Sequence, residues 1–158
     1  MKKIILFILV IVIIAFVIHL NRKRGSEYFS NYLDKMIQSG EEKKIDEFTG
    51  FFSIHYRDKN GINYIYLRKI IESQFNKYES FEASYNNLDV SKNYKDKSGN
   101  TLIDINIDVM VTGYQEGIPV EILGESGHPD NITLTLRRSF PNSWKIVSVR
   151  DIDSNRDY

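Results

Sequence analysis

Residues 101–112 read TLIDINIDVMVT, and this stretch decides the fold. Apolar and polar residues alternate along most of it. Because successive side chains of a β-strand point to opposite faces of its sheet, the alternation predicts one long strand with a buried face and a wet face. The buried face comprises Ile103, Ile105, Ile107, Val109 and Val111. The wet face comprises Asp104, Asn106 and Asp108.

Similar strands are predicted on both sides of this stretch. Ile132, Leu134 and Leu136 alternate with polar residues in the same way. Flanking strands are predicted at Phe81–Val90, Ile118–Leu123 and Trp144–Asp151. Turn-forming residues separate them at Lys95–Asn100, Gln115–Gly117, Gly124–Asp130 and Pro141–Ser143. Short connections of this kind indicate an antiparallel meander.

Before Tyr78 the apolar period is helical. One helix is predicted between a Ser26 cap and Gly40, and a short second helix follows around Phe48. A third helix is predicted after Asn63, its expected cap. The apolar stripe of the first helix contains Tyr28, Phe29, Tyr32, Leu33, Met36 and Ile37. Helices followed by strands indicate an α+β fold, with three N-terminal helices packed on one face of a curved antiparallel sheet.

Composition supports one domain after residue 24. The 134 residues that follow include 18 aromatic rings, enough to build a core. They carry 16 Lys and Arg against 21 Asp and Glu, a formal net charge of −5. A domain that binds nucleic acid through phosphates needs a basic face, so nucleic-acid binding is not expected. The chain has no cysteine, which excludes disulfides and thiolate chemistry.

The first 24 residues predict a membrane anchor. Ile4–Leu20 is a 17-residue segment without formal charge, and as a helix it would span about 26 Å of a roughly 30 Å hydrocarbon core. Basic residues flank it, and Arg22, Lys23 and Arg24 follow its end. A cleaved signal peptide is the alternative, but the apolar run is long and lacks a small-x-small cleavage site. We therefore expect an uncleaved single-pass anchor over 1–24 and a domain over 25–158.

The orientation of this anchor follows from its short N-terminal tail. Basic residues on the two sides nearly balance, so the positive-inside rule does not decide. A three-residue tail favours a cytoplasmic N-terminus and an extracytoplasmic domain in the inner (cytoplasmic) membrane. The alternative is a domain that faces the cytoplasm.

The order of elements resembles a known family. Two short helices, the YRDKNG turn at Tyr56–Gly61, a helix ending near Tyr78, a long-stranded meander and a closing SWKIVSV at Ser143–Val149 are similar to the NTF2-like superfamily. This superfamily includes SnoaL-type and ketosteroid isomerase-like cones, and the resemblance covers roughly Glu27–Asp153. It implies a cone fold, often behind an N-terminal anchor in bacteria, but it does not imply one activity.

Two polar clusters are candidate sites. The enzymes of this superfamily pair a carboxylate base with an oxyanion donor deep in the cone, and no such pair can be carried over here. Tyr56 and Asp58 near the expected mouth are the closest candidates, and the alternative is a turn in which Asp58 accepts backbone N–H groups. The loop GESGHPD at Gly124–Asp130 offers Glu125 and His128, but it lacks the second glycine of a nucleophile elbow and a second histidine for a metal site.

We therefore predict a non-catalytic binding or assembly module at the cell envelope, anchored in membrane lipid. The sheet face would contact an envelope protein or a second copy of the chain. The alternative is a small-molecule carrier or enzyme with a residual pocket lined by tyrosines. Its residues would be Tyr56, Tyr64, Tyr85, Asp58, Glu125 and His128. No metal or cofactor is predicted.

Asp104 and Asp108 form the remaining candidate cluster. On one strand face they lie some 13 Å apart, at about 3.3 Å per residue, which is too far for both to bind one ion unless neighbouring strands add ligands. We expect a solvated outer face on which these acids oppose Arg137 or Arg150.

Overall fold

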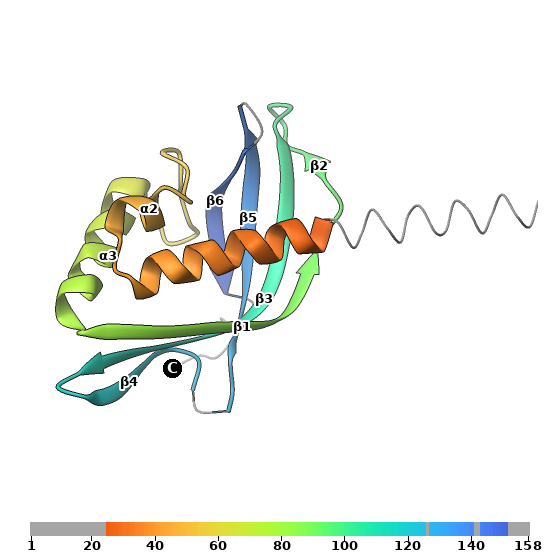
Figure 1. The fold of residues 1–158 in the computed structure, drawn as a ribbon. Helices are drawn as coiled ribbons and strands as arrows, with labels where there is room; N and C mark the ends of the chain where they lie inside the picture. The colour runs from red at the N-terminus through yellow and green to blue at the C-terminus, as the bar shows by residue number, and fades with distance from the viewer. Residues whose placement is uncertain (1–24, 126, 141–142, 152–158) are drawn as a thin grey trace, which may run out of the picture.

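The structure, a computed structural model, describes residues 25–125, 127–140 and 143–151. It is an α+β fold in which three helices lie on one face of a six-stranded sheet (Figure 1). The helices are the N-terminal helix (residues 25–41), α2 (Ile45–Thr49) and α3 (Tyr64–Lys77). The strands are β1 (Ser80–Val90), β2 (Tyr94–Lys95), β3 (Thr101–Gln115), β4 (Ile118–Leu123), β5 (Asp130–Ser139) and β6 (Ser143–Asp151).

Strand β3 organises the sheet. One edge of β3 pairs with β1 and then with β2, while the other edge pairs with β5 over its first part and with β4 over its last part. All these pairings are antiparallel, and β6 completes the sheet beside β5. The arrangement is therefore not a simple meander. At 15 residues, β3 is longer than any single partner, so two strands share each of its edges.

The core lies between β3, β5 and the N-terminal helix. The predicted alternation of β3 is confirmed from Ile103 to Val109, because the four apolar residues of this stretch are buried while the residues between them are not. Val111, assigned to the same buried face, is only half-buried. Ile105, Leu136 and Ile146 are fully buried. The rest of this cluster is supplied mainly by Phe29, Leu33, Phe52, Tyr56 and Leu134. The helices therefore cover the sheet with aromatic rings and close its concave face.

A second aromatic cluster holds the end of α3 against β1 and β3. The Phe75 and Phe81 rings lie 5.5 Å apart, and Tyr78 and Phe81 lie 5.6 Å apart. Tyr78 packs directly over Gly113, where an added Cβ would come within 2.7 Å of the tyrosine ring. Glycine at this position of β3 therefore permits the close approach of α3.

Side chains at the helix ends explain where α3 begins and how α2 is held. Asn63 is the cap of α3, as predicted, and its side chain accepts the Tyr66 N–H at 3.0 Å. Arg68 of α3 reaches α2, where its Nη2 lies 2.7 Å from Asp46 Oδ1 and its Nη1 donates to Thr49 Oγ1. This charged contact joins the two helices in addition to the Phe48 and Phe75 rings, whose centroids lie 5.9 Å apart.

Residues 51–57 protect the outer edge of β6. The Ile146 N–H donates to the Phe51 carbonyl at 2.9 Å, and the Ser53 N–H donates to the Ile146 carbonyl at 2.8 Å. The Arg57 N–H then donates to the Val147 carbonyl at 3.0 Å. An unpaired strand edge is a template for aggregation, so this segment supplies the partner that the last strand lacks.

Two expectations about the first helix are corrected, and one strand is new. The described part of the N-terminal helix already includes Gly25 and Ser26, so Ser26 is not a cap outside it, and the helix runs to residue 41. Tyr28, assigned to the core stripe, is 46% exposed because the sheet does not extend under this edge of the helix. The two-residue strand β2 was not predicted.

The predicted anchor, Ile4–Leu20, lies outside the described residues, as do its basic flanks. Within the described ranges, no helix is long and apolar enough to cross a membrane.

Candidate functional site

The first predicted site pair lies in a turn beside β6. Asp58 Oδ1 accepts the N–H groups of Asn60 at 2.8 Å and of Ile62 at 2.9 Å, which is the turn geometry considered from the sequence. Tyr56 is buried and packs edge-on against Phe52. Burial, together with the nearby Asp58 charge, raises the pKa of Tyr56 to about 12. Tyr64 begins α3 and packs against the core.

Tyr85 lies on β1, and its side chain contacts the N-terminal helix. Its hydroxyl is 2.8 Å from Ser30 Oγ and donates to Asp34 Oδ1 at 3.0 Å. Desolvation is the main cause that raises the pKa of Tyr85, and the hydrogen bond to Asp34 adds to it. These contacts attach the middle of the N-terminal helix to β1. Tyr85 also lines a shallow pocket beside this helix.

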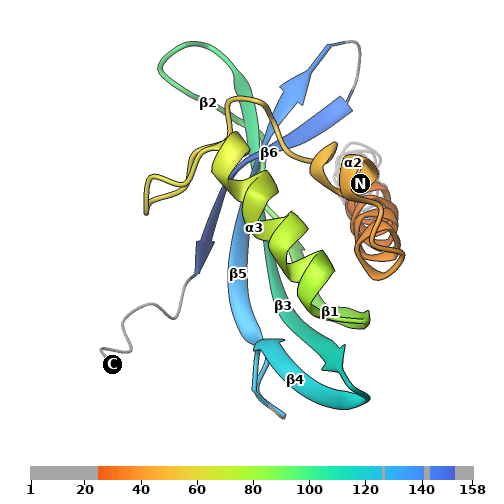
Figure 2. The ribbon, with the colours of Figure 1, turned by 90° about the vertical axis from the view of Figure 1, so that its left-hand side faces the viewer.

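Glu125 and His128 occupy the loop between β4 and β5. Their backbones form an isolated bridge in which each N–H donates to the other's carbonyl, at 2.9 Å and 2.7 Å. Both side chains are exposed. This loop and the turn at 56–61 lie at opposite ends of the sheet (Figures 1 and 2). The six predicted site residues therefore do not converge on one pocket.

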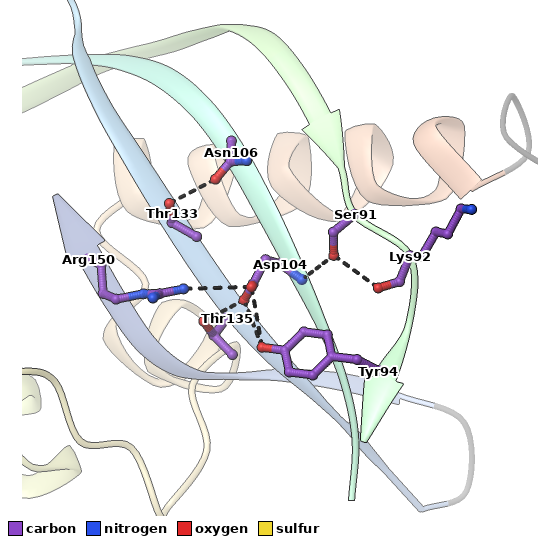
Figure 3. Close-up of polar contacts among 8 residues, drawn as sticks. All are labelled: Ser91, Lys92, Tyr94, Asp104, Asn106, Thr133, Thr135 and Arg150. Atoms are coloured by element: carbon purple, nitrogen blue, oxygen red, sulfur yellow. Dashed lines mark hydrogen bonds and ion pairs between the residues drawn. The ribbon is translucent and has the colours of Figure 1, made fainter. Parts of the chain in front are cut away.

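The outer face of the sheet carries a polar network centred on Asp104 (Figure 3). Thr135 Oγ1 donates to Asp104 Oδ1 at 2.7 Å, and the Tyr94 hydroxyl donates to the same oxygen at 3.2 Å. Arg150 Nη2 lies 3.6 Å from Asp104 Oδ2 and approaches from the side opposite to Tyr94. Arg150 is thus the opposing cation expected from the sequence, whereas Arg137 donates to Ser53 Oγ instead.

Asp108, four residues further along β3, is bound by two amides. Asn87 and Asn131 both donate to its carboxylate, with Asn131 Nδ2 at 2.6 Å from Oδ1. These hydrogen bonds, with Asn87 first, lower the pKa of Asp108. Both acids of the outer face are therefore engaged by protein donors. In the described part of the chain, no group of three His, Asp or Glu side chains is arranged to hold a metal ion.

A pocket of 750 Å³ opens beside residues 25–29, the first residues of the described part of the N-terminal helix, and we call it the helix-start pocket. Its floor is apolar and includes Phe29, Ile103 and Trp144. The Trp144 and Phe29 rings meet edge-on with centroids 5.8 Å apart. The remaining lining residues are Gly25, Ser26, Tyr28, Asp89, Val90, Ser91, Lys92 and Asn93.

Trp144 is a pocket residue that the sequence analysis did not name as a candidate. Alternation along Trp144–Asp151 puts it on the same face as Ile146, which is fully buried. The structure leaves Trp144 partly exposed, because it lies near the start of β6 at the rim of the sheet. It lines both the helix-start pocket and a second pocket of 540 Å³ beside Tyr32 and Lys145. Ile105 lies in the centre of the core and lines neither pocket. Neither pocket therefore extends into the core behind the middle of β3.

Comparison with known proteins shows the fold. No family model matches the sequence, and no curated protein matches it. The helical cell shape determining protein Pgp2 (K307A mutant) of Campylobacter jejuni aligns with a TM-score of 0.60 and 11% identity over 75% of this chain and 37% of that chain. Bd1075 of Bdellovibrio bacteriovorus aligns with a TM-score of 0.57 and 12% identity over 79% of this chain and 40% of that chain.

A scytalone dehydratase-like protein from Novosphingobium aromaticivorans matches over a larger share of its own length. Its TM-score is 0.57 at 10% identity, and the alignment covers 85% of both chains. The chain thus spans about two fifths of the first two proteins and most of the third. These likenesses support the NTF2-like α+β fold that the sequence resemblance implied.

Proposed function

We propose that this protein is a single-pass, membrane-anchored NTF2-like domain that acts as a non-catalytic binding or assembly module at the cell envelope. The 17-residue uncharged segment Ile4–Leu20 supports the anchor, and we place the domain on the extracytoplasmic side. The domain would present its exposed faces to another envelope protein or to a second copy of itself.

The observation that carries this proposal is the filled interior of the cone. Ile105, Leu136 and Ile146 have no exposed surface, and Leu33 is 2% exposed. An enzyme of this fold needs a cavity with convergent polar groups behind the sheet. Apolar side chains occupy that space here, and the ionisable candidates are distributed over separate ends of the domain. Recognition at the surface is therefore the function that this geometry supports best.

One structural neighbour supports a modular role. Pgp2 is a helical cell shape determining protein, and only 37% of its length corresponds to this chain. The NTF2-like fold thus occurs as one part of a larger protein that determines cell shape. By analogy, we place this domain among proteins that work with the cell envelope, joined to its surroundings by a membrane segment.

Membrane fractionation tests the anchor. The full chain should remain with membranes after carbonate or high-salt washing, because burial of apolar side chains in lipid does not depend on ionic strength. Release of the full chain by either wash would contradict the proposal.

Site-specific crosslinking in native membranes tests the binding role. A photoreactive phenylalanine analogue at Tyr94 would lie on the outer sheet face, and the same analogue at the exposed Lys69 of α3 is the matched control. We expect one recurring adduct from Tyr94, either a protein of defined mass or a dimer with a differently tagged copy. Equal adducts from both positions would show that the sheet face is not a specific surface.

The alternative function is a small-molecule carrier or enzyme. It is favoured only by the helix-start pocket, whose 750 Å³ lie within the range of ligand pockets. This alternative would be favoured if substitution of the pocket residues abolished the function of the protein in cells and left the crosslinked adduct of the sheet face unchanged.

A further inference from the structure

The helix-start pocket combines an apolar floor with an unpaired cation at its rim. Phe29 and Ile103 belong to the core and form part of the floor, and Trp144 extends it toward solvent. Lys92 stands at the rim beside the first turn of the N-terminal helix (Figure 3). With the described residues, the Lys92 ammonium forms no hydrogen bond or ion pair. A pocket of this kind can accept an apolar chain that ends in an anionic group.

Three further basic residues are adjacent in sequence to a residue of this pocket. Arg22, Lys23 and Arg24 directly precede Gly25, which itself lines the pocket. Asp89 is the one acidic side chain among the lining residues. Basic residues beside a membrane segment attract anionic lipid headgroups. Lys92, together with the basic residues that precede Gly25 in the sequence, therefore favours an anionic lipid.

The connection to the anchor brings the pocket close to the bilayer. Four residues, and so five Cα–Cα steps, separate Leu20, the end of the predicted membrane segment, from Gly25. Even fully extended, they reach no more than roughly 18 Å at about 3.5 Å per residue. Figure 1 shows the start of the N-terminal helix on the same side of the domain as the end of β1 and β2. The pocket thus lies at the end of the domain where the described chain begins.

We infer that the helix-start pocket binds an anionic phospholipid of the membrane that holds the anchor. One acyl chain lies against Phe29, Ile103 and Trp144, and the headgroup phosphate pairs with Lys92. This inference rests on the proposed membrane anchor and adds a ligand to it. A bound lipid would fix the orientation of the domain relative to the bilayer, because it would join the domain to the membrane at a second point.

The test uses the full chain in vesicles that contain phosphatidylglycerol with a diazirine near the end of one acyl chain. After illumination and trypsin digestion, labels are assigned to residues by fragmentation. Residues 4–22 report on the anchor, whereas residues 25–35 and 139–145 report on the pocket. We expect label on the anchor and also on Phe29 or Trp144.

Three variants decide whether that label reflects a site. Lys92→Glu reverses the rim charge, and Ser26→Trp fills the opening from the first turn of the helix. Lys97→Glu is the matched control, because it makes the same charge change outside the pocket. Both pocket variants should reduce the label on the pocket peptides roughly tenfold, and the control should not. Thermal melts of all three variants verify folding, and the two pocket variants provide independent tests if one of them unfolds.

The outcomes separate this inference from the proposed function. Label confined to residues 4–22 would overturn the lipid site and leave the anchor standing. Pocket label that neither variant reduces would indicate general contact with the bilayer surface and would also overturn the site. No label in any of the three peptides, with release of the chain by carbonate, would overturn the anchor and the lipid site together.

Discussion

At the scale of single residues, a substitution of Asp104 tests whether the polar network on the outer face of the sheet stabilises the fold. Its carboxylate accepts from Thr135 and Tyr94 and faces Arg150. Asp104→Asn should therefore destabilise the domain by about 1 kcal/mol, because one acceptor oxygen is replaced by a donor group. The measurement is urea unfolding, with Asp89→Asn as a control that removes the same charge from an exposed position of β1.

Thermal melting with added ions tests whether this face binds a metal. Because protein donors already occupy the carboxylates of Asp104 and Asp108, added calcium or magnesium should not raise the melting temperature of the wild-type domain. A rise of several degrees that disappears in the Asp104→Asn, Asp108→Asn double variant would identify a cation site on the outer face.

The raised pKa of Tyr56 predicts that the free energy of unfolding falls at alkaline pH. Its folded-state pKa of about 12 is above the ordinary value near 10, so folding favours the protonated hydroxyl. The resulting stabilisation is fully present below about pH 10 and is lost as the pH rises through the folded pKa. Tyr56→Phe should therefore unfold with a flatter stability profile over this range. Parallel profiles for the two proteins would mean that Tyr56 does not titrate differently on folding.

At the scale of elements, the contact between α3 and β3 depends on Gly113. An added Cβ would meet the Tyr78 ring at 2.7 and 2.8 Å and Ile122 Cδ1 at 2.9 Å. Gly113→Ala should destabilise the domain by about 1–3 kcal/mol through overpacking. Gly25→Ala is the control, since a Cβ there meets nothing within 4 Å. Equal thermal melts of the two variants would show that Tyr78 moves aside without cost.

Elements with a local signal could be predicted, and elements that depend on distant partners could not. The alternation of β3, the Asn63 cap and the Asp58 turn are each encoded within a few neighbouring residues. The alternation cannot show which strands share an edge of β3, so the order of β4 and β5 was missed. Nor does a local pattern indicate that residues 51–57 pair with β6.

The candidate site was predicted less well than the fold, for the same reason. Tyr56, Tyr85 and Glu125 are chemically suited to a site, but their convergence depends on the tertiary arrangement, which separates them. The helix-start pocket is built from four segments that are distant in sequence, and its apolar residues have the same periodicity as core residues. Trp144 and Ile146 lie on the same face of β6 and differ only in their distance from the rim of the sheet. The period of apolar residues does not show where that rim lies.

At the scale of the whole molecule, the domain should fold without the anchor. Residues 25–158 contain all of the described core and have a formal net charge of −5. A fragment that begins at Gly25 should therefore be soluble and should unfold cooperatively with heat. Circular dichroism and a single melting transition check this. A disordered fragment would place the domain boundary upstream of Gly25.

The pairing of residues 51–57 with β6 has a consequence for synthesis of the chain. Ser53 emerges from the ribosome more than ninety residues before its partner Ile146. Contacts so distant in sequence form late and slow folding. During translation, β1, β3 and β4 can assemble while β5 still lacks its outer neighbour, so the nascent chain carries an open sheet edge until its last strand arrives. We therefore expect a ribosome-bound chain truncated before β6 to recruit chaperones, and the completed chain to release them.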